Sequence, residues 1–367
     1  MRRRDLLEKA VLAGVGIVAA PLVNRGRCRL FAGVREYSIR AVDLVSHSAV
    51  VDMLGLLTLD WPKLDAWHAD PARFTAADAR KLRDSGITVF HPAVQLNQDE
   101  PCAAAERCFW LWNRFLESHP GDLLRIDSAA GIELARQTHR TGVMLGLQNS
   151  DHFRSASDVA FFHALGQRIS QLTYNGANLI GCGCGERRDT GLTAFGAEIV
   201  QAMNRAGMAI DVSHAGERTT LDAIAASARP ILITHSNCRA LVPHPRCKSD
   251  AVIRAMAARG SVMGLTGIRM FVSRSEPATL HDLLDHYDHV ARLVGVEHLG
   301  IGSDSDPDGR DSAARGRRRV PLEISGINHS RRIFDLTEGL LRRGYTDRHV
   351  ELILGGNVRR VLGEICA

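Results

Sequence analysis

The chain has 367 residues, of which 45% are hydrophobic and 24% are charged, the composition of an ordinary folded globular protein. This composition excludes a disordered, collagenous or coiled-coil chain, and a chain of this length buries a large core without disulfide staples. The net charge is +5, but seven of the 46 basic residues and only two of the 41 acidic residues lie in positions 1–32, which leaves 39 of each sign in the remainder. Because the body of the chain is neutral, we expect no nucleic-acid partner.

The first 32 residues have the features of a leader. Three consecutive arginines, Arg2, Arg3 and Arg4, precede an uncharged stretch over residues 10–23 that is rich in Ala, Gly and Val. This arrangement resembles a twin-arginine export signal, and the alternative is a frayed basic tail followed by a short helix. The apolar stretch of 14 residues is shorter than the ~20 residues that span a bilayer. We therefore expect a mature chain without a transmembrane segment, exported to the periplasm, or cytoplasmic if the leader does not function.

Eight short apolar runs follow the leader and alternate with amphipathic stretches typical of helices, such as residues 75–85, 194–205 and 219–227. Nearly continuous apolar runs of this length are typical of parallel strands buried on both faces. Eight strand-helix repeats predict a (β/α)8 TIM barrel, in a single domain over residues 46–367. The alternative is a doubly wound open sheet, which would carry a glycine-rich phosphate loop after its first strand, and none is present there. The predicted strands are residues 49–54, 87–92, 143–148, 169–174, 208–214, 230–236, 261–266 and 298–304.

Polar residues end five of the eight predicted strands. In such a barrel the active site is built at the carboxyl ends of the strands, so these side chains are expected to converge on one mouth. A buried histidine satisfied by a backbone carbonyl is commoner than a metal ligand, but two histidines at the ends of neighbouring strands favour a zinc site, because neutral imidazole is a preferred nitrogen ligand of that ion. The five residues are Gln148, Tyr174, His214, His235 and Asp304.

Several segments of the chain resemble the membrane (renal) dipeptidase family of metallopeptidases, whose members have an amidohydrolase-type barrel. The segments are GLTAFG (191–196), MNRAGM (203–208), DVSH (211–214), THSNCRAL (234–241), HPR (244–246), GSD (302–304) and GGN (355–357). The resemblance implies that metal at the barrel mouth activates a water, which attacks an amide carbonyl. It further implies that His214 and His235 bind one metal ion and that Asp304 handles protons near the attacking water. It assigns the substrate's carboxylate to Arg246, whose planar guanidinium suits that task.

The chain departs from the family pattern at the second metal. Leu54 and Leu56 stand where the family has a His-x-Asp pair on the first strand, and neither leucine can bind a cation. Gln148 replaces the bridging glutamate, and Tyr174 replaces a histidine of the substrate pocket. His91 is the only spare imidazole nearby, and we do not expect it to act as a ligand. Since two divalent ions need several carboxylates and this site offers one, we expect a single ion.

The sequence therefore predicts one zinc ion, or another divalent metal, held by His214, His235 and the amide oxygen of Gln148 or a water. Asp304 would take a proton from the attacking water and return it to the leaving amine, and Tyr174 would donate a hydrogen bond to the developing oxyanion. The expected reaction is hydrolysis of a dipeptide or a small amide. The alternative is a barrel that has lost catalysis and binds a small ligand or a protein partner. The sequence does not settle the oligomeric state, and a homodimer remains open.

Overall fold

The computed structural model describes residues 26–30, 35–96, 99–310 and 321–366. Residues 1–25 lie outside these ranges, so the export signal remains a prediction. The last residues of the predicted leader form β1 (Arg27–Arg29), which pairs antiparallel with β2 (Glu36–Ser38). Within the described ranges, no helix has the length and apolar character that a bilayer crossing requires.

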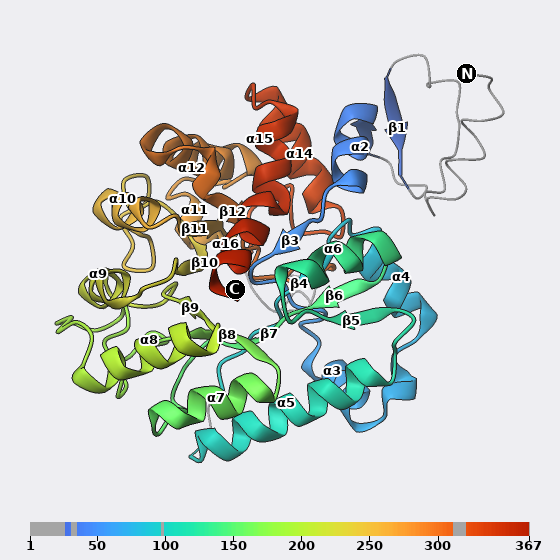
Figure 1. Cartoon of the computed structure of the whole chain (residues 1–367). Helices are drawn as coiled ribbons and strands as arrows, with labels where there is room; N and C mark the ends of the chain where they lie inside the picture. Colours follow the sequence, from blue (N-terminus) through green and yellow to red (C-terminus); the bar gives the residue numbers. More distant parts are fainter. Residues whose placement is uncertain (1–25, 31–34, 97–98, 311–320, 367) are drawn as a thin grey trace.

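Parallel strands of the described chain close into a barrel, which confirms the predicted fold (Figure 1). The strands are β3 (Val51–Asp52), β4 (Val89–Phe90), β5 (Leu123–Arg125), β6 (Thr141–Val143), β7 (Leu145–Leu147), β8 (Gln167–Gln171), β9 (Ala209–Asp211), β10 (Leu232–Ser236), β11 (Val262–Leu265) and β12 (Leu299–Ile301). They follow the order β5-β6-β4-β3-β12-β11-β10-β9-β8-β7. The barrel closes because only Met144 separates β6 from β7 and because Val94, beyond the end of β4, bridges Leu147 of β7. β6 and β7 thus serve together as the third barrel strand.

Each of the eight predicted strands overlaps an observed strand, although β8 begins two residues before the predicted 169–174 and β6 lies before the predicted 143–148 apart from Val143, whereas β5 was not predicted. β5 lies outside the barrel, paired only with β6 in the described sheet. Its three residues are Leu-Leu-Arg, with only the first fully buried, so the sequence has no apolar run there to mark it.

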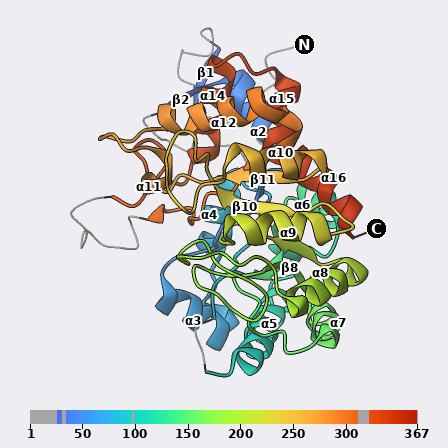
Figure 2. The same cartoon turned by 90° about the vertical axis from the view of Figure 1, so that its left-hand side faces the viewer.

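Helices alternate with the barrel strands and cover the outside of the barrel (Figures 1 and 2). The predicted helices 75–85, 194–205 and 219–227 correspond to α4 (Ala76–Asp84), α8 (Ala194–Ala206) and α9 (Glu217–Ala226). The helices are α2 (Ile39–His47), α3 (Trp61–Ala69), α4 (Ala76–Asp84), α5 (Pro101–Glu117), α6 (Ala129–Thr138), α7 (Ala156–Ala164), α8 (Ala194–Ala206), α9 (Glu217–Ala226), α10 (Asp250–Ala258), α11 (Arg269–Val272), α12 (Leu280–Val294), α14 (Arg332–Arg342), α15 (Asp347–Glu351) and α16 (Asn357–Ile365), with short helical turns at Pro71–Arg73, Val296–His298 and Leu352–Gly356.

Local signals set the ends of these helices. The Thr75 side chain accepts a hydrogen bond from the Asp78 N–H, and Asp78 reciprocates, which makes a capping box at the start of α4. Thr193 caps α8 in the same position, and Gly207 ends it with a left-handed φ of 72°. These caps keep the helices short, so that each one returns the chain to the next barrel strand.

A dense apolar cluster fills the amino-terminal end of the barrel. It combines side chains from the strands with α16, including Val51, Val89, Ile169, Leu232, Val262, Val361 and Leu362. Packing of this kind leaves no room for a ligand at that end, because protein interiors are packed as densely as organic crystals. The site is therefore built at the carboxyl ends of the strands, as is usual for this fold.

Candidate functional site

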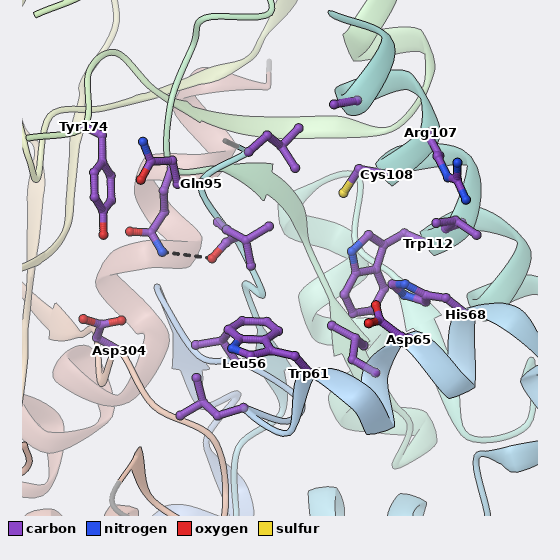
Figure 3. A pocket seen from close by; sticks show the side chains of 18 of the residues that line it. Leu56, Trp61, Asp65, His68, Gln95, Arg107, Cys108, Trp112, Tyr174 and Asp304 are labelled. Carbon is purple, nitrogen blue, oxygen red and sulfur yellow. Dashed lines mark hydrogen bonds between the residues drawn. The ribbon is translucent and has the colours of Figure 1, made fainter. Parts of the chain in front are cut away.

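The predicted site residues at the strand ends do come together. Gln148, Tyr174 and Asp304 line one cavity of about 780 Å³ at the carboxyl end of the barrel (Figure 3). The ring of Tyr174 also stacks on His214, with 4.1 Å between ring centroids and 18° between planes. His214 in turn contacts His235, so Tyr174 joins the cavity wall to the histidine pair, which does not itself line the cavity.

The two histidines face each other through their Nε2 atoms, which lie 2.9 Å apart. Nδ1 of His214 lies 2.8 Å from Oδ1 of Asn175, an acceptor, so this Nδ1 carries the proton. Nδ1 of His235 lies 2.8 Å from the hydroxyl of Thr234, whose own proton goes to Oδ2 of Asp211 at 2.7 Å. Nδ1 of His235 is therefore also the donor. In their neutral forms, both Nε2 atoms present lone pairs to each other.

Two facing lone pairs repel each other, so this pair of tautomers needs a cation between or beside them; without one, a neutral ring in the Nε2–H form would donate to the other. A proton is a poor candidate, because burial lowers the pKa of both imidazoles well below 6.5 and the charge of Arg246 lowers it further. A metal ion suits the pair better, since two nitrogen ligands of one tetrahedral zinc ion stand about 3.3 Å apart. The Asn175 and Thr234 contacts fix the imidazole tautomers, as partners of metal-binding histidines commonly do. The donor set thus fits one cation.

The number of metal ions stays a prediction. Nowhere in the described ranges, the histidine pair included, do three or more His, Cys, Asp or Glu side chains gather in a way that could hold a metal ion. Leu56 lines the cavity and Leu54 is fully buried, so hydrocarbon occupies this part of the barrel, as the sequence predicts. The side-chain nitrogen of Gln148 donates to the carbonyl of Ala93 at 3.0 Å, which leaves its Oε1 as the atom free to bind a ligand.

Asp304 lies where the backbone leaves β12. Its φ of 55° places a non-glycine residue in the left-handed region, and its N–H donates to the carbonyl of Leu54 at 2.8 Å. Its Oδ1 accepts a hydrogen bond of 2.5 Å from Arg310, which also lines the cavity. Burial raises the pKa of Asp304, against the opposing positive charges of Arg310 and Arg246. Asp304 is thus a carboxylate of increased basicity, oriented by a guanidinium that the sequence analysis did not single out.

Arg246 does not line the cavity wall in this structure. Its side chain is buried, and its two terminal nitrogens donate to the carbonyls of Ser213 at 2.6 Å and His235 at 2.9 Å. Its Nε is buried without a partner in the described chain. Arg246 therefore holds the backbone that carries both histidines, and its role in binding a carboxylate remains a prediction.

Lys248 supports the same backbone from the other side. Its fully buried ammonium donates to the carbonyls of Val212 at 2.7 Å and Ala215 at 2.9 Å, which flank His214. Burial, followed by the charge of Arg246, lowers its pKa to about 7. The sequence carried no signal for this contact, since a lysine in a loop is usually exposed to solvent.

The spare imidazole of His91 stays inside the barrel. Its Nδ1 donates to the carbonyl of Met53 at 2.6 Å, while its Nε2 is buried with no partner in the described chain. The ring fits there because residue 146 is glycine: a Cβ at Gly146 would lie 2.2 Å from this Nε2. His91 is near enough to His235 for its charge to lower the pKa of His235, and the expectation that it is no metal ligand stays a prediction.

Comparison with known proteins points to one family. The sequence pattern of the family described as "Membrane dipeptidase (Peptidase family M19)" matches residues 39–367. Dipeptidase tcpJ of Claviceps purpurea is 32% identical over 248 residues, which is 66% of this chain and 56% of that protein. Dipeptidase verJ of Clonostachys rogersoniana is 32% identical over 244 residues, again covering 56% of that protein. The chain thus spans just over half the length of these curated relatives.

Solved structures show the same architecture. An amidohydrolase from Pseudomonas aeruginosa superposes with a TM-score of 0.76 at 29% identity, covering 89% of this chain and 98% of that one. A metallopeptidase from Rhodobacter sphaeroides, solved with a phosphinate mimic of the dipeptide L-Ala-D-Ala, has a TM-score of 0.71 at 19% identity and covers 86% and 98% of the two chains. The second likeness supports the fold alone.

Proposed function

Since the chain belongs to the membrane dipeptidase family, peptidase family M19, we propose that it is a metal-dependent hydrolase with one metal ion, cleaving a dipeptide or a related small amide that bears a free carboxylate. The observation that carries this proposal is the pair of imidazole Nε2 atoms of His214 and His235, 2.9 Å apart, close to a cavity with a carboxylate in its wall. A barrel that merely binds a ligand has no need for two imidazoles held in this tautomer.

His214 and His235 would hold the ion, with Oε1 of Gln148 or water completing its coordination. Zinc is the expected ion because two imidazole nitrogens are its usual ligands, and other divalent metals remain open. An ion there would supply Lewis-acid chemistry, by lowering the pKa of a bound water and polarising the amide carbonyl. Asn175 and Thr234 keep both imidazoles in the ligating tautomer.

Asp304 is the proposed general base and acid. Its position in the cavity wall and its raised pKa suit a carboxylate that accepts a proton from the attacking water and returns it to the leaving amine. Arg310 holds Oδ1, which leaves Oδ2 for proton transfer. Tyr174 lies in the same wall, and burial raises its pKa, so its hydroxyl stays protonated and able to donate to a developing oxyanion.

The substrate's carboxylate needs a guanidinium that can reach it. Arg246 was predicted for this role, but a carboxylate there would compete with the carbonyls of Ser213 and His235. Arg310 lies in the cavity wall already, with part of its side chain exposed. We therefore propose Arg310 as the first contact of the carboxylate, with Arg246 as the alternative.

Hydrolysis of a panel of L,L- and L,D-dipeptides, with zinc present and with zinc removed by a chelator, tests the proposal. The expected result is zinc-dependent hydrolysis that Asp304→Asn lowers by about 10²–10⁴-fold in kcat. Asp65→Asn is the matched control, because Asp65 lines the opposite end of the same cavity (Figure 3). Full activity of the Asp304→Asn variant would remove Asp304 as the base, and no hydrolysis of any amide by the zinc-loaded protein would favour the binding barrel.

We also propose export through the twin-arginine-like leader, on the strength of Arg2, Arg3 and the apolar stretch that follows. Replacement of both arginines by lysine preserves the charge and removes the motif. The expected result is that the full chain moves from the periplasmic to the cytoplasmic fraction. Unchanged export of the lysine variant would contradict this proposal.

A further inference from the structure

The cavity is longer than the chemistry at its polar end requires. Tyr174 and Asp304 lie at one end, and Trp61 and Trp112 lie toward the other, beyond Leu56 (Figure 3). The cavity has a volume of about 780 Å³. Pockets that bind drug-sized ligands have volumes of roughly 300–1,000 Å³, so the cavity is large enough for such a ligand. A small dipeptide at the polar end would leave the rest of this space empty.

The far end is an aromatic limb, which we define as Trp61 and Leu64 of α3 with Leu111 and Trp112 of α5. Arg114 of α5 donates to the carbonyl of Ala69, at the end of α3, at 3.0 Å, which ties the two helices together. Trp112 is buried and meets the His68 ring edge-on at 4.8 Å between centroids. Trp61 is 46% exposed, so the limb has one fixed wall and one wall that a ligand could cover.

Charge in the cavity argues against a free ammonium group near the scissile bond. Asp304 and Asp65 are the acidic residues of the described cavity wall, and Asp304 is already paired with Arg310. Asp65 lies at the far end, and Leu56 occupies the wall between. Burial lowers the pKa of His68 to about 4, so this imidazole is neutral at pH 7. An ammonium group beside Asp304 would therefore lose hydration without finding an unpaired carboxylate in that part of the described wall.

We propose that the aromatic limb binds the acyl half of the substrate, and that the preferred substrates are N-acyl amino acids with a long apolar acyl chain. The amino-acid half would place its carboxylate at Arg310 and its amide beside Asp304. The acyl chain would then run past Leu56 to Trp112, burying apolar surface that no dipeptide of small residues can bury. The cleavage of this class rests on the proposed function, whereas the binding preference does not.

A chain-length series tests the inference with the full protein. The probes are N-acetyl-, N-hexanoyl- and N-dodecanoyl-alanine, in both enantiomers, with the dipeptide Ala-Ala for comparison. Binding is measured by titration calorimetry and by tryptophan fluorescence, and hydrolysis by release of alanine. The zinc-loaded protein is expected to bind the dodecanoyl compound at least 100-fold more tightly than the acetyl compound, and more tightly than Ala-Ala.

Three variants separate the limb from general hydrophobic binding. Trp61→Ala removes the exposed wall, and Leu64→Glu places a charge in the limb; each is expected to lower the affinity for the dodecanoyl compound at least tenfold and to leave that for the acetyl compound unchanged. Trp110→Ala is the control, because Trp110 lies on α5, is 58% exposed and does not line the cavity. Equal affinity along the series, or an equal effect of Trp110→Ala, would overturn the inference.

The two proposals fail in different ways. Binding that is selective for long chains, without hydrolysis of any amide, would leave the inference standing as a binding preference and would remove the hydrolase. Hydrolysis of dipeptides, with no effect of acyl length on either binding or kcat/KM, would leave the hydrolase standing and would remove the aromatic limb from substrate recognition.

Discussion

The Thr234 hydroxyl donates its proton to Asp211 and accepts one from Nδ1 of His235, so a single hydroxyl fixes which nitrogen of His235 is free to bind an ion. The Asp211 carboxylate is itself held by the N–H groups of Ser213 and Thr234 at 2.9 and 3.0 Å. This chain of hydrogen bonds is buried throughout, and low dielectric strengthens it. It connects the ends of β9 and β10, the two strands that deliver the histidine pair.

The Thr234→Val variant should weaken zinc binding without unfolding the protein. Valine keeps the shape of the side chain but removes the acceptor for Nδ1 of His235, so the ring is free to rotate or to change tautomer. Loss of such an outer partner typically costs 10–100-fold in metal affinity. Competition with a chromophoric chelator measures the Kd of zinc. Thr337→Val is the control, because the Thr337 hydroxyl is buried on α14 without a partner in the described chain.

Replacement of Arg310 by glutamine should act on substrate binding. Arg310 lies in the cavity wall and contacts Asp304, so its loss removes the proposed carboxylate contact, frees Oδ1 of Asp304 and thereby also lowers kcat, and leaves the barrel intact. We expect KM to rise about tenfold or more, in line with ~1.5–3 kcal/mol for a hydrogen bond to a charged group, with the melting temperature nearly unchanged. An unchanged KM for carboxylate-bearing substrates would contradict this assignment.

Replacement of Arg246 by glutamine should instead act on stability. The variant leaves the carbonyls of Ser213 and His235 without their donors in a buried setting, which costs about 1–3 kcal/mol for each such group. Urea unfolding measures this loss directly. A variant of unchanged stability with a strongly raised KM would show that Arg246, rather than Arg310, binds the carboxylate.

Glu323 should make the protein less stable as the pH rises from about 4.5 to 7. Burial raises the pKa of this carboxyl from 4.5 to about 7 in the folded protein, with the charge of Arg332 opposing the rise. Between these values the folded state holds a proton that the unfolded state has lost, so the stabilisation present below pH 4.5 is lost as the pH passes 7. The full effect is on the order of 3 kcal/mol.

Glu323→Gln tests this dependence, because glutamine has the shape of the protonated acid and does not titrate. As the pH rises from 4.5 to 7, the natural protein should lose unfolding free energy relative to the glutamine variant. Above pH 7 the difference between the two proteins should stay constant. A difference that stays constant across this range would contradict the raised pKa. The comparison of the two proteins cancels the titration of all other groups they share.

The barrel was predictable because its strands are buried on both faces and read as continuous apolar runs, five of which have a polar residue at the carboxyl end. The convergence of Gln148, Tyr174, His214, His235 and Asp304 followed from that topology. The contacts around the site could not be predicted in this way, because the direction of a side chain depends on tertiary packing. Arg246 turns to backbone carbonyls, while Arg310, in a segment with no strand pattern, reaches the cavity.

The aromatic limb could not be predicted from the sequence either. Trp61 and Trp112 are far apart in the chain and belong to helices whose packing no motif records. Only the contact between α3 and α5 brings both residues to one cavity. By contrast, the prediction that positions 54 and 56 supply no metal ligand needs only the sequence, because a leucine side chain cannot bind a cation wherever the strand places it.

The ratio of zinc to protein tests the central claim most directly. The chain is purified without chelator after growth in added zinc, and metal is measured by elemental analysis. One zinc ion per chain is expected, lost in His214→Ala and in His235→Ala while circular dichroism shows both variants folded. A ratio near zero would contradict the metal-dependent hydrolase. A ratio near two would show that ligands other than this histidine pair complete a second centre.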